Sequence, residues 1–170
     1  MTLTDRETWA ALHGMIFGAL FLLAFAGGFA GLYSLRPALM TPQGIIERTR
    51  RLIFGTWAMA IIAWATVISG SWIVYPWYRA AGATSPKSIL IANVNTAQWH
   101  TFGMEWKEHI AWIAPILATT VAIVVAYYGR DLVKNDGVRR VLMVVFTLAF
   151  ACAAVAGLLG AFITKAAPVH

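Results

Sequence analysis

The sequence predicts an all-α integral membrane protein whose four transmembrane helices form an up-down bundle. The chain of 170 residues is 60% hydrophobic and only 12% charged, with a mean hydropathy of +0.71. A soluble domain has roughly a quarter of its residues charged. The charges are also clustered, so four stretches of 20 or more residues contain no Asp, Glu, Lys or Arg, namely residues 8–35, 52–78, 110–129 and 141–164. Because a helix needs about 20 apolar residues to cross the hydrocarbon core, each stretch is long enough to span a bilayer.

The whole chain, residues 1–170, is expected to form a single transmembrane domain. The predicted helices cover about 9–35, 52–75, 110–128 and 141–164, and a long outer loop covers 76–109. Membrane-spanning strands are not expected, since polarity does not alternate along the apolar stretches. The first stretch is expected to remain as a helix, because it is too long for the apolar core of a secretory signal and little positive charge precedes it.

The distribution of basic residues predicts the orientation of the bundle. Eight basic residues lie in the two connections that join the first helix to the second and the third to the fourth, and they are Arg36, Arg48, Arg50, Arg51, Arg130, Lys134, Arg139 and Arg140. Five lie toward the other side. Short cytoplasmic loops are enriched in Lys and Arg. We therefore expect a protein of the cytoplasmic (inner) membrane with both termini and the 76–109 loop outside. The same argument explains the pI near 9.9 without nucleic acid, which is not expected as a partner.

The outer loop contains a start signal for a further helical turn. Asn95 or Thr96 can act as an N-cap. A helix that begins there can run through Gly103 into the third transmembrane helix, which would then project beyond the bilayer.

Two histidines near the predicted outer surface are candidate haem ligands. His13 lies about one turn into the first helix, and His109 lies at the start of the third. These two helices are parallel in an up-down bundle and usually diagonal, so the imidazoles can face each other at a similar height. Two neutral imidazoles from different helices are the ligand set of a membrane b-type haem. Gly14 and Gly18 can make room for a flat ring beside His13.

In helix number and ligand type, the chain resembles four-helix membrane-bound b-type cytochrome subunits. The residues that carry this resemblance are the segments 12–15 (LHGM) and 105–109 (EWKEH). Quinone-linked members of that class carry two haems on opposite sides of the membrane. No histidine lies in the inner half of any predicted helix here. The resemblance therefore implies at most one haem b, near the outer face, with His100 or the carboxylates near a quinol head group.

The segment before the third helix also suggests a metal site. His100 and Met104 are one helical turn apart, as are Glu105 and His109, and Glu108 is adjacent. Histidine with methionine suits copper, whereas carboxylate with histidine suits iron, manganese or zinc. His13 can complete either set.

Three functions follow from these patterns. The first is a membrane electron-transfer subunit with one b-type haem near the periplasmic face, passing electrons between quinol and an outer partner such as a cytochrome c-like protein. The second is an accessory subunit of a larger respiratory or photosynthetic complex, with tryptophans and small residues forming partner interfaces. The third is a non-haem copper or iron site. The sequence does not decide whether the chain is an enzyme itself or a subunit of an oxidoreductase. It contains no phosphate-binding loop, Gly-x-Ser-x-Gly elbow or HExxH motif.

Overall fold

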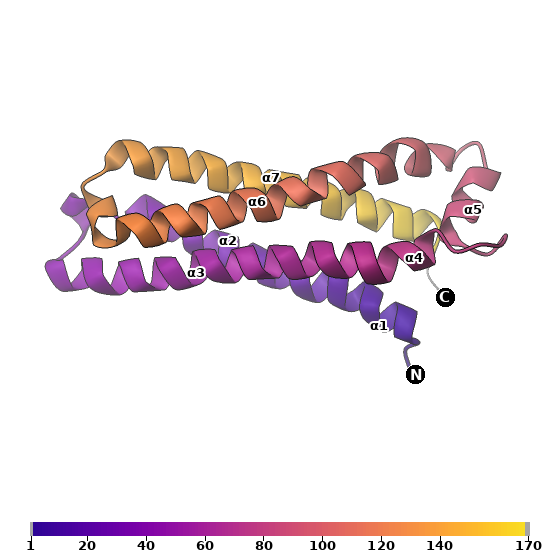
Figure 1. Ribbon diagram of the computed structural model, residues 1–170, viewed down its shortest axis with the longest axis horizontal. Helices are drawn as coiled ribbons and strands as arrows, with labels where there is room; N and C mark the ends of the chain where they lie inside the picture. Colours follow the sequence, from indigo (N-terminus) through magenta and orange to yellow (C-terminus); the bar gives the residue numbers. More distant parts are fainter. Residues whose placement is uncertain (1, 169–170) are drawn as a thin grey trace.

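The computed structural model describes residues 2–168, and these form a bundle of four long helices (Figure 1). The four continuous helical stretches are Asp5–Ser34, Pro42–Tyr78, Trp99–Val133 and Asp136–Ala166, and each is long and apolar enough to cross a membrane. All secondary structure in the described residues is helical. The predicted fold class, an all-α membrane bundle with four spans, is therefore confirmed.

Three of the long helices are built from several segments. The first consists of α1 (Asp5–Ala11), a π-helical turn (Leu12–Ile16) and α2 (Phe17–Ser34). The second consists of α3 (Pro42–Ser69), a π-helical turn (Gly70–Val74) and α4 (Tyr75–Tyr78). The third consists of a π-helical turn (Trp99–Met104), α6 (Glu105–Tyr128) and a 3-10 turn (Gly129–Val133). The fourth is α7 (Asp136–Ala166), and two short elements, a 3-10 turn (Pro37–Leu39) and α5 (Pro86–Ala92), lie in the connections.

The observed helices extend beyond the apolar stretches that predicted them. The second begins at Pro42 because Thr41 caps it, its hydroxyl accepting from the Gly44 amide at 3.1 Å. The charged residues Glu47, Arg48, Arg50 and Arg51 thus lie on a helix and not in a loop. The third begins at Trp99, so the segment expected as the loop 76–109 shortens to the residues between Tyr78 and Trp99 and contains α5. Charge ends an apolar stretch but does not end a helix.

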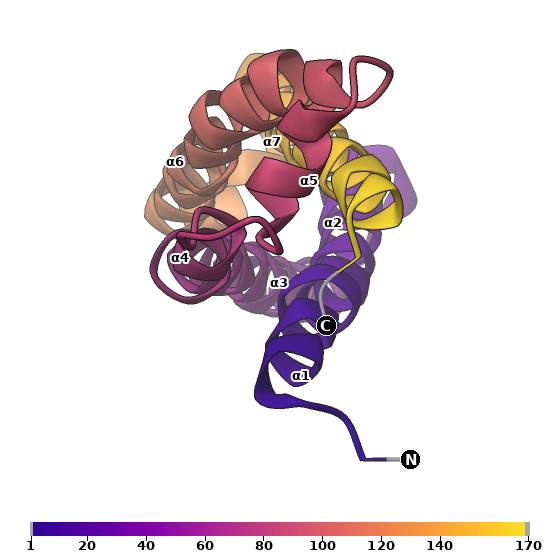
Figure 2. The same cartoon turned by 90° about the vertical axis from the view of Figure 1, so that its right-hand side faces the viewer.

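The four long helices surround a common core in a ring. The contacting pairs are α2 with α3, α3 with α6, α6 with α7, and α7 with α2. An end-on view shows α2 diagonally opposite α6, with α5 lying across one end of the bundle (Figure 2). Both described ends of the chain lie at this end, which we call the termini end (Figure 1). The opposite end carries the basic connections and is called the arginine end.

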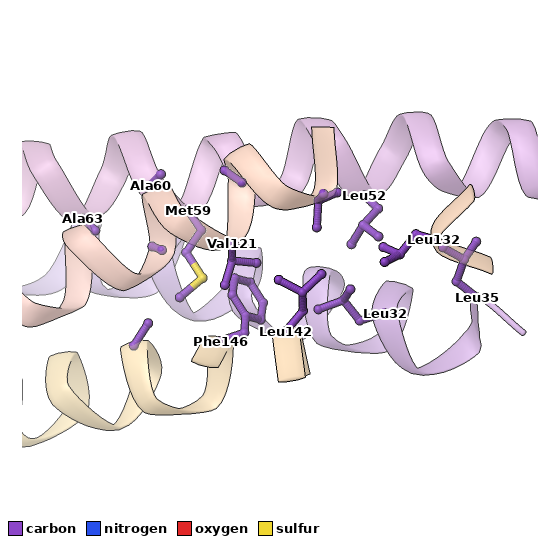
Figure 3. Close-up of a cluster of buried hydrophobic side chains, with 14 of the residues drawn as sticks. Leu32, Leu35, Leu52, Met59, Ala60, Ala63, Val121, Leu132, Leu142 and Phe146 are labelled. Atoms are coloured by element: carbon purple, nitrogen blue, oxygen red, sulfur yellow. The ribbon is translucent and has the colours of Figure 1, made fainter. Parts of the chain in front are cut away.

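The main core lies between the middle of the bundle and the arginine end. Its side chains come from all four long helices and include Leu32, Met59, Val121 and Phe146, which are fully buried (Figure 3). Phe146 stacks obliquely on Phe25, with ring centroids 5.3 Å apart. Because lipid tails are as apolar as these side chains, helices in a membrane associate chiefly by close packing. The core therefore depends on shape more than on hydrophobicity.

A buried arginine closes the arginine end of α7. Arg139 is 3% exposed. Its guanidinium donates to the Val133 carbonyl at 3.4 Å and is paired with Asp136, one turn earlier on α7. Asp136 also pairs with the exposed Arg140. A charge at this depth is stable only with such partners.

Glycine contacts give a direct test of this packing. A Cβ added at Gly28 would lie 2.8 Å from the Phe146 ring, whereas one added at Gly27 would meet no atom within 4 Å. We expect Gly28→Ala to destabilise the bundle by about 1–3 kcal/mol through overpacking. Gly27→Ala, the matched control, should be neutral or slightly stabilising, since alanine favours helix. Unfolding of purified protein titrated from mild detergent into SDS measures both. Equal stabilities would contradict the packing described here.

Candidate functional site

Within residues 2–168, the long helices contain three π-helical turns, all toward the termini end. The π-helical turns Leu12–Ile16, Gly70–Val74 and Trp99–Met104 belong to three different helices, and each contains one glycine, at position 14, 70 or 103. A π-helical turn adds one residue to a turn, shifts the side chains that follow and occurs frequently at functional sites. The partly or fully buried polar residues His13, Ser69 and His100 lie in or directly beside these turns.

His13 is held by the start of the second π-helical turn. Its Nδ1 lies 3.1 Å from the Ser69 hydroxyl oxygen, and that hydroxyl donates its only proton to the Thr66 carbonyl at 3.0 Å. The Ser69 oxygen must then accept from His13, so in the neutral imidazole Nδ1 carries the proton and Nε2 keeps a lone pair. A Cβ at residue 70 would lie 2.7 Å from His13 Cε1. The ring therefore occupies its position because residue 70 is glycine.

His109 has the same proton arrangement but faces away from the bundle. Its Nδ1 lies 2.7 Å from the Glu105 carbonyl oxygen. A carbonyl only accepts, so Nδ1 donates and Nε2 again keeps its lone pair. The side chain is exposed, on the same helical stripe as the exposed Ile113 and Ile116. His13, in contrast, is half-buried against Ser69 and Gly70.

These positions bear on the expected haem site. Each imidazole has the tautomer that a metal-binding histidine adopts, with Nδ1–H bonded to a protein oxygen and Nε2 free to coordinate. Each histidine alone is a suitable ligand for haem iron. The two do not fit the same haem, because His109 lies on the outward stripe of α6 and does not oppose His13 across the bundle.

A network of charged and phenolic groups joins the second and third helices. Tyr75 donates its hydroxyl proton to Glu108 at 3.0 Å. Arg79 donates to Glu105 at 3.1 Å and to Glu108 at 3.5 Å, and its guanidinium stacks over the Tyr75 ring at 4.9 Å. One arginine therefore pairs with both carboxylates. The sequence predicted the two glutamates as candidate ligands but gave no sign of the roles of Tyr75 and Arg79, which lie far from them in the chain.

Lys107 lies on the inward side of the same turn. Its aliphatic stem packs against α7, where a Cβ at Gly160 would lie 3.0 Å from Lys107 Cε. The glycine at position 160 thus admits a long cationic side chain between α6 and α7.

His100 and Met104 are enclosed beneath α5. The His100 Nδ1 lies 2.9 Å from the Tyr78 hydroxyl, and both residues are buried. Met104 belongs to the adjoining apolar cluster with Tyr78, Leu90, Ile163 and Ala167. His100 therefore closes the end of the bundle together with Tyr78.

The predicted metal ligands therefore do not form one cluster, and each group of them has a different partner. Within residues 2–168, no three His, Cys, Asp or Glu side chains lie close enough together to hold one metal ion. The two glutamates bind Arg79, His100 binds Tyr78, His13 binds Ser69, and His109 faces outward.

Comparison of the chain with models of known protein families, with curated proteins and with solved structures found no match. The site itself must therefore supply the functional argument.

The buried tyrosine–histidine pair makes a testable contribution to stability. Tyr78→Phe leaves the buried His100 nitrogen without its hydroxyl partner, which costs about 1–3 kcal/mol. Tyr127→Phe is the matched control, because Tyr127 is 83% exposed and should change stability by less than about 0.5 kcal/mol. SDS-induced unfolding of the purified variants measures the difference. A Tyr78→Phe variant as stable as the wild type would show that this bond does not help to close the bundle.

Proposed function

We propose that this protein is a membrane subunit of an electron-transfer complex and that its termini end binds a redox cofactor together with a neighbouring subunit. The observation that supports this most directly is that two imidazoles each have a nitrogen available to coordinate a metal. His13 and His109 each hold Nδ1–H against a protein oxygen and present an Nε2 lone pair.

Haem b is the cofactor that we propose. When bound, it supplies a one-electron carrier, and the axial ligands tune its potential. Because His109 is exposed and His13 does not oppose it, one of these two histidines would hold the haem from this chain and a neighbouring chain would supply the other ligand. A ligand from a second chain would make the protein part of a larger complex. We propose that quinol is the electron donor and that an outer cytochrome c-like protein is the acceptor.

The carboxylate network suits the proton chemistry of quinol. A quinol releases protons as it is oxidised, and a positioned carboxylate can accept them. Glu108 lies next to a phenolic hydroxyl and to Arg79, so a proton reaching it alters a network that is already hydrogen-bonded.

An accessory role without a cofactor is the second candidate function. The side chains of Trp72 and Trp106 are 67% and 54% exposed near the termini end, and large aromatic side chains are enriched in protein interfaces. Such a subunit would co-purify with larger subunits in mild detergent and show no visible absorption. A copper or iron ion shared with a partner is the remaining alternative, and metal analysis of protein purified without chelator tests it.

The haem proposal predicts a spectroscopic change when the ligand from this chain is removed. The reduced-minus-oxidised spectrum of the complex in native membranes should show the α and Soret bands of haem. Of His13→Ala and His109→Ala, the variant that loses the haem ligand should lose most of the intensity of these bands, and the other variant should keep them. His170→Ala, a histidine without an assigned role, serves as the control. Unchanged bands in both variants, with the protein still present, would reject the ligand assignment.

The proposed location in the inner membrane predicts a definite orientation. In a Cys152→Ala background, which removes the only cysteine, a cysteine placed at Ala83 should react with a membrane-impermeant maleimide added from outside. A cysteine placed at Asn135 should react only after the membrane is opened, since the arginine end faces the cytoplasm under the positive-inside rule. The reverse labelling pattern would invert the proposed topology.

A further inference from the structure

A groove between α2 and α3 opens on the side of the bundle near the arginine end. It has a volume of about 330 Å³ and is lined by Leu23, Ala24, Gly27, Gly28, Gly31, Arg48, Arg51, Leu52 and Gly55. This lies within the range of ligand-binding pockets, roughly 300–1,000 Å³. Its position is remote from the histidines and carboxylates described above.

Glycines give the groove its depth. Its floor is formed by Gly28 and Gly31, which are buried and pack on Phe146 and Leu52. At Gly27 and Gly55, a Cβ would meet nothing within 4 Å, so these two positions leave open space where another residue would place a side chain. The residues from Leu23 to Gly31 span about 12 Å along α2 at 1.5 Å per residue. That length matches most of one leaflet of a hydrocarbon core that is about 30 Å thick.

Two arginines lie at one end of this apolar groove. Arg48 donates one N–H to Ser34 at 2.8 Å, which fixes its guanidinium beside the groove and leaves further donors for another acceptor. Arg51 is 3.9 Å from Glu47, and both side chains are largely exposed. Such a surface pair is weak and leaves Arg51 able to bind a stronger anion.

We propose that this groove binds one anionic phospholipid, with an acyl chain along the glycines and the phosphate at Arg48 and Arg51. The two parts of the groove match the two parts of that molecule in length, polarity and charge. Guanidinium groups bind phosphate oxygens through paired N–H donors. A basic pocket at the membrane surface beside an apolar interhelical groove is the arrangement by which membrane proteins hold anionic lipids.

Lipid retention in native mass spectrometry tests the proposal. Purified protein in mild detergent would be titrated with phosphatidylglycerol and, separately, with phosphatidylcholine. The wild type should retain one phosphatidylglycerol in clear preference. The double variant Arg48→Gln, Arg51→Gln should lose this preference by roughly tenfold or more, because each basic residue near an anionic headgroup contributes about a fivefold preference. The double variant Gly27→Leu, Gly55→Leu should retain neither lipid at this site, since the two leucine side chains fill the groove.

Matched controls separate a built site from general attraction. Arg50→Gln removes a neighbouring exposed charge that does not line the groove, and Gly18→Leu adds a side chain at another open position on α2. Both should retain phosphatidylglycerol as the wild type does. Equal losses from Arg50→Gln and from the Arg48, Arg51 variant would show a nonspecific charge effect and overturn the proposal. Retention unchanged by the leucine variant, with normal helical circular dichroism, would also overturn it. Gly27→Ala, which only narrows the groove, replaces the leucine variant if that protein does not fold.

Discussion

In a bilayer, each backbone N–H and C=O must find its partner within the protein, and this constraint governs the whole structure. It leaves helices as the spanning elements here and makes any departure from α-helical hydrogen bonding costly. The three π-helical turns of residues 2–168 are such departures, and all lie toward the termini end, where His13 and His100 are found. One of these turns helps to position a polar side chain. The turn that starts at Gly70 follows directly on Ser69, which holds the His13 ring.

A second recurring feature is the close packing of a side chain from one helix against a glycine of another. Gly28 accommodates the Phe146 ring, Gly70 accommodates the His13 ring, and Gly160 accommodates the Lys107 stem. The same absence of a side chain thus serves packing in the core and the placement of polar groups near the termini end. Where a glycine has no neighbour, as at Gly27 and Gly55, it leaves a groove instead.

The sequence was sufficient to predict the helical class and the number of spans, because both follow from the spacing of charged residues. For the same reason, the apolar stretches alone placed the starts of the second and third helices too late, whereas the start signal at Asn95 or Thr96 correctly predicted that the third helix runs through Gly103. The segments 47–51 and 105–108 are rich in charged residues but helical, so a boundary drawn at the first charge falls too late. The capping residue Thr41 was the signal that would have corrected the second helix.

The candidate site was harder to predict from sequence, because it depends on helix rotation. His13, His100 and His109 were recognisable as residue types. That His109 shares the outward stripe of Ile113 and Ile116 follows only from how α6 packs on its neighbours. A π-helical turn directly before α6 changes the angular position of every residue in it relative to a regular helix. Tyr75 and Arg79 lie some 30 residues before their partners and follow another such turn, so no local pattern links them to Glu105 and Glu108.

Arg139 has a consequence for the position of the protein along the membrane normal. Its charge is enclosed by protein at the arginine end and tied to Asp136 and the Val133 carbonyl. Sliding α7 toward the bilayer centre would carry this ion pair, with Arg140 beside it, into hydrocarbon at a cost of several kcal/mol. Sliding it the other way would expose the apolar middle of the helix to water. This ion pair therefore sets the depth of the arginine end in the membrane.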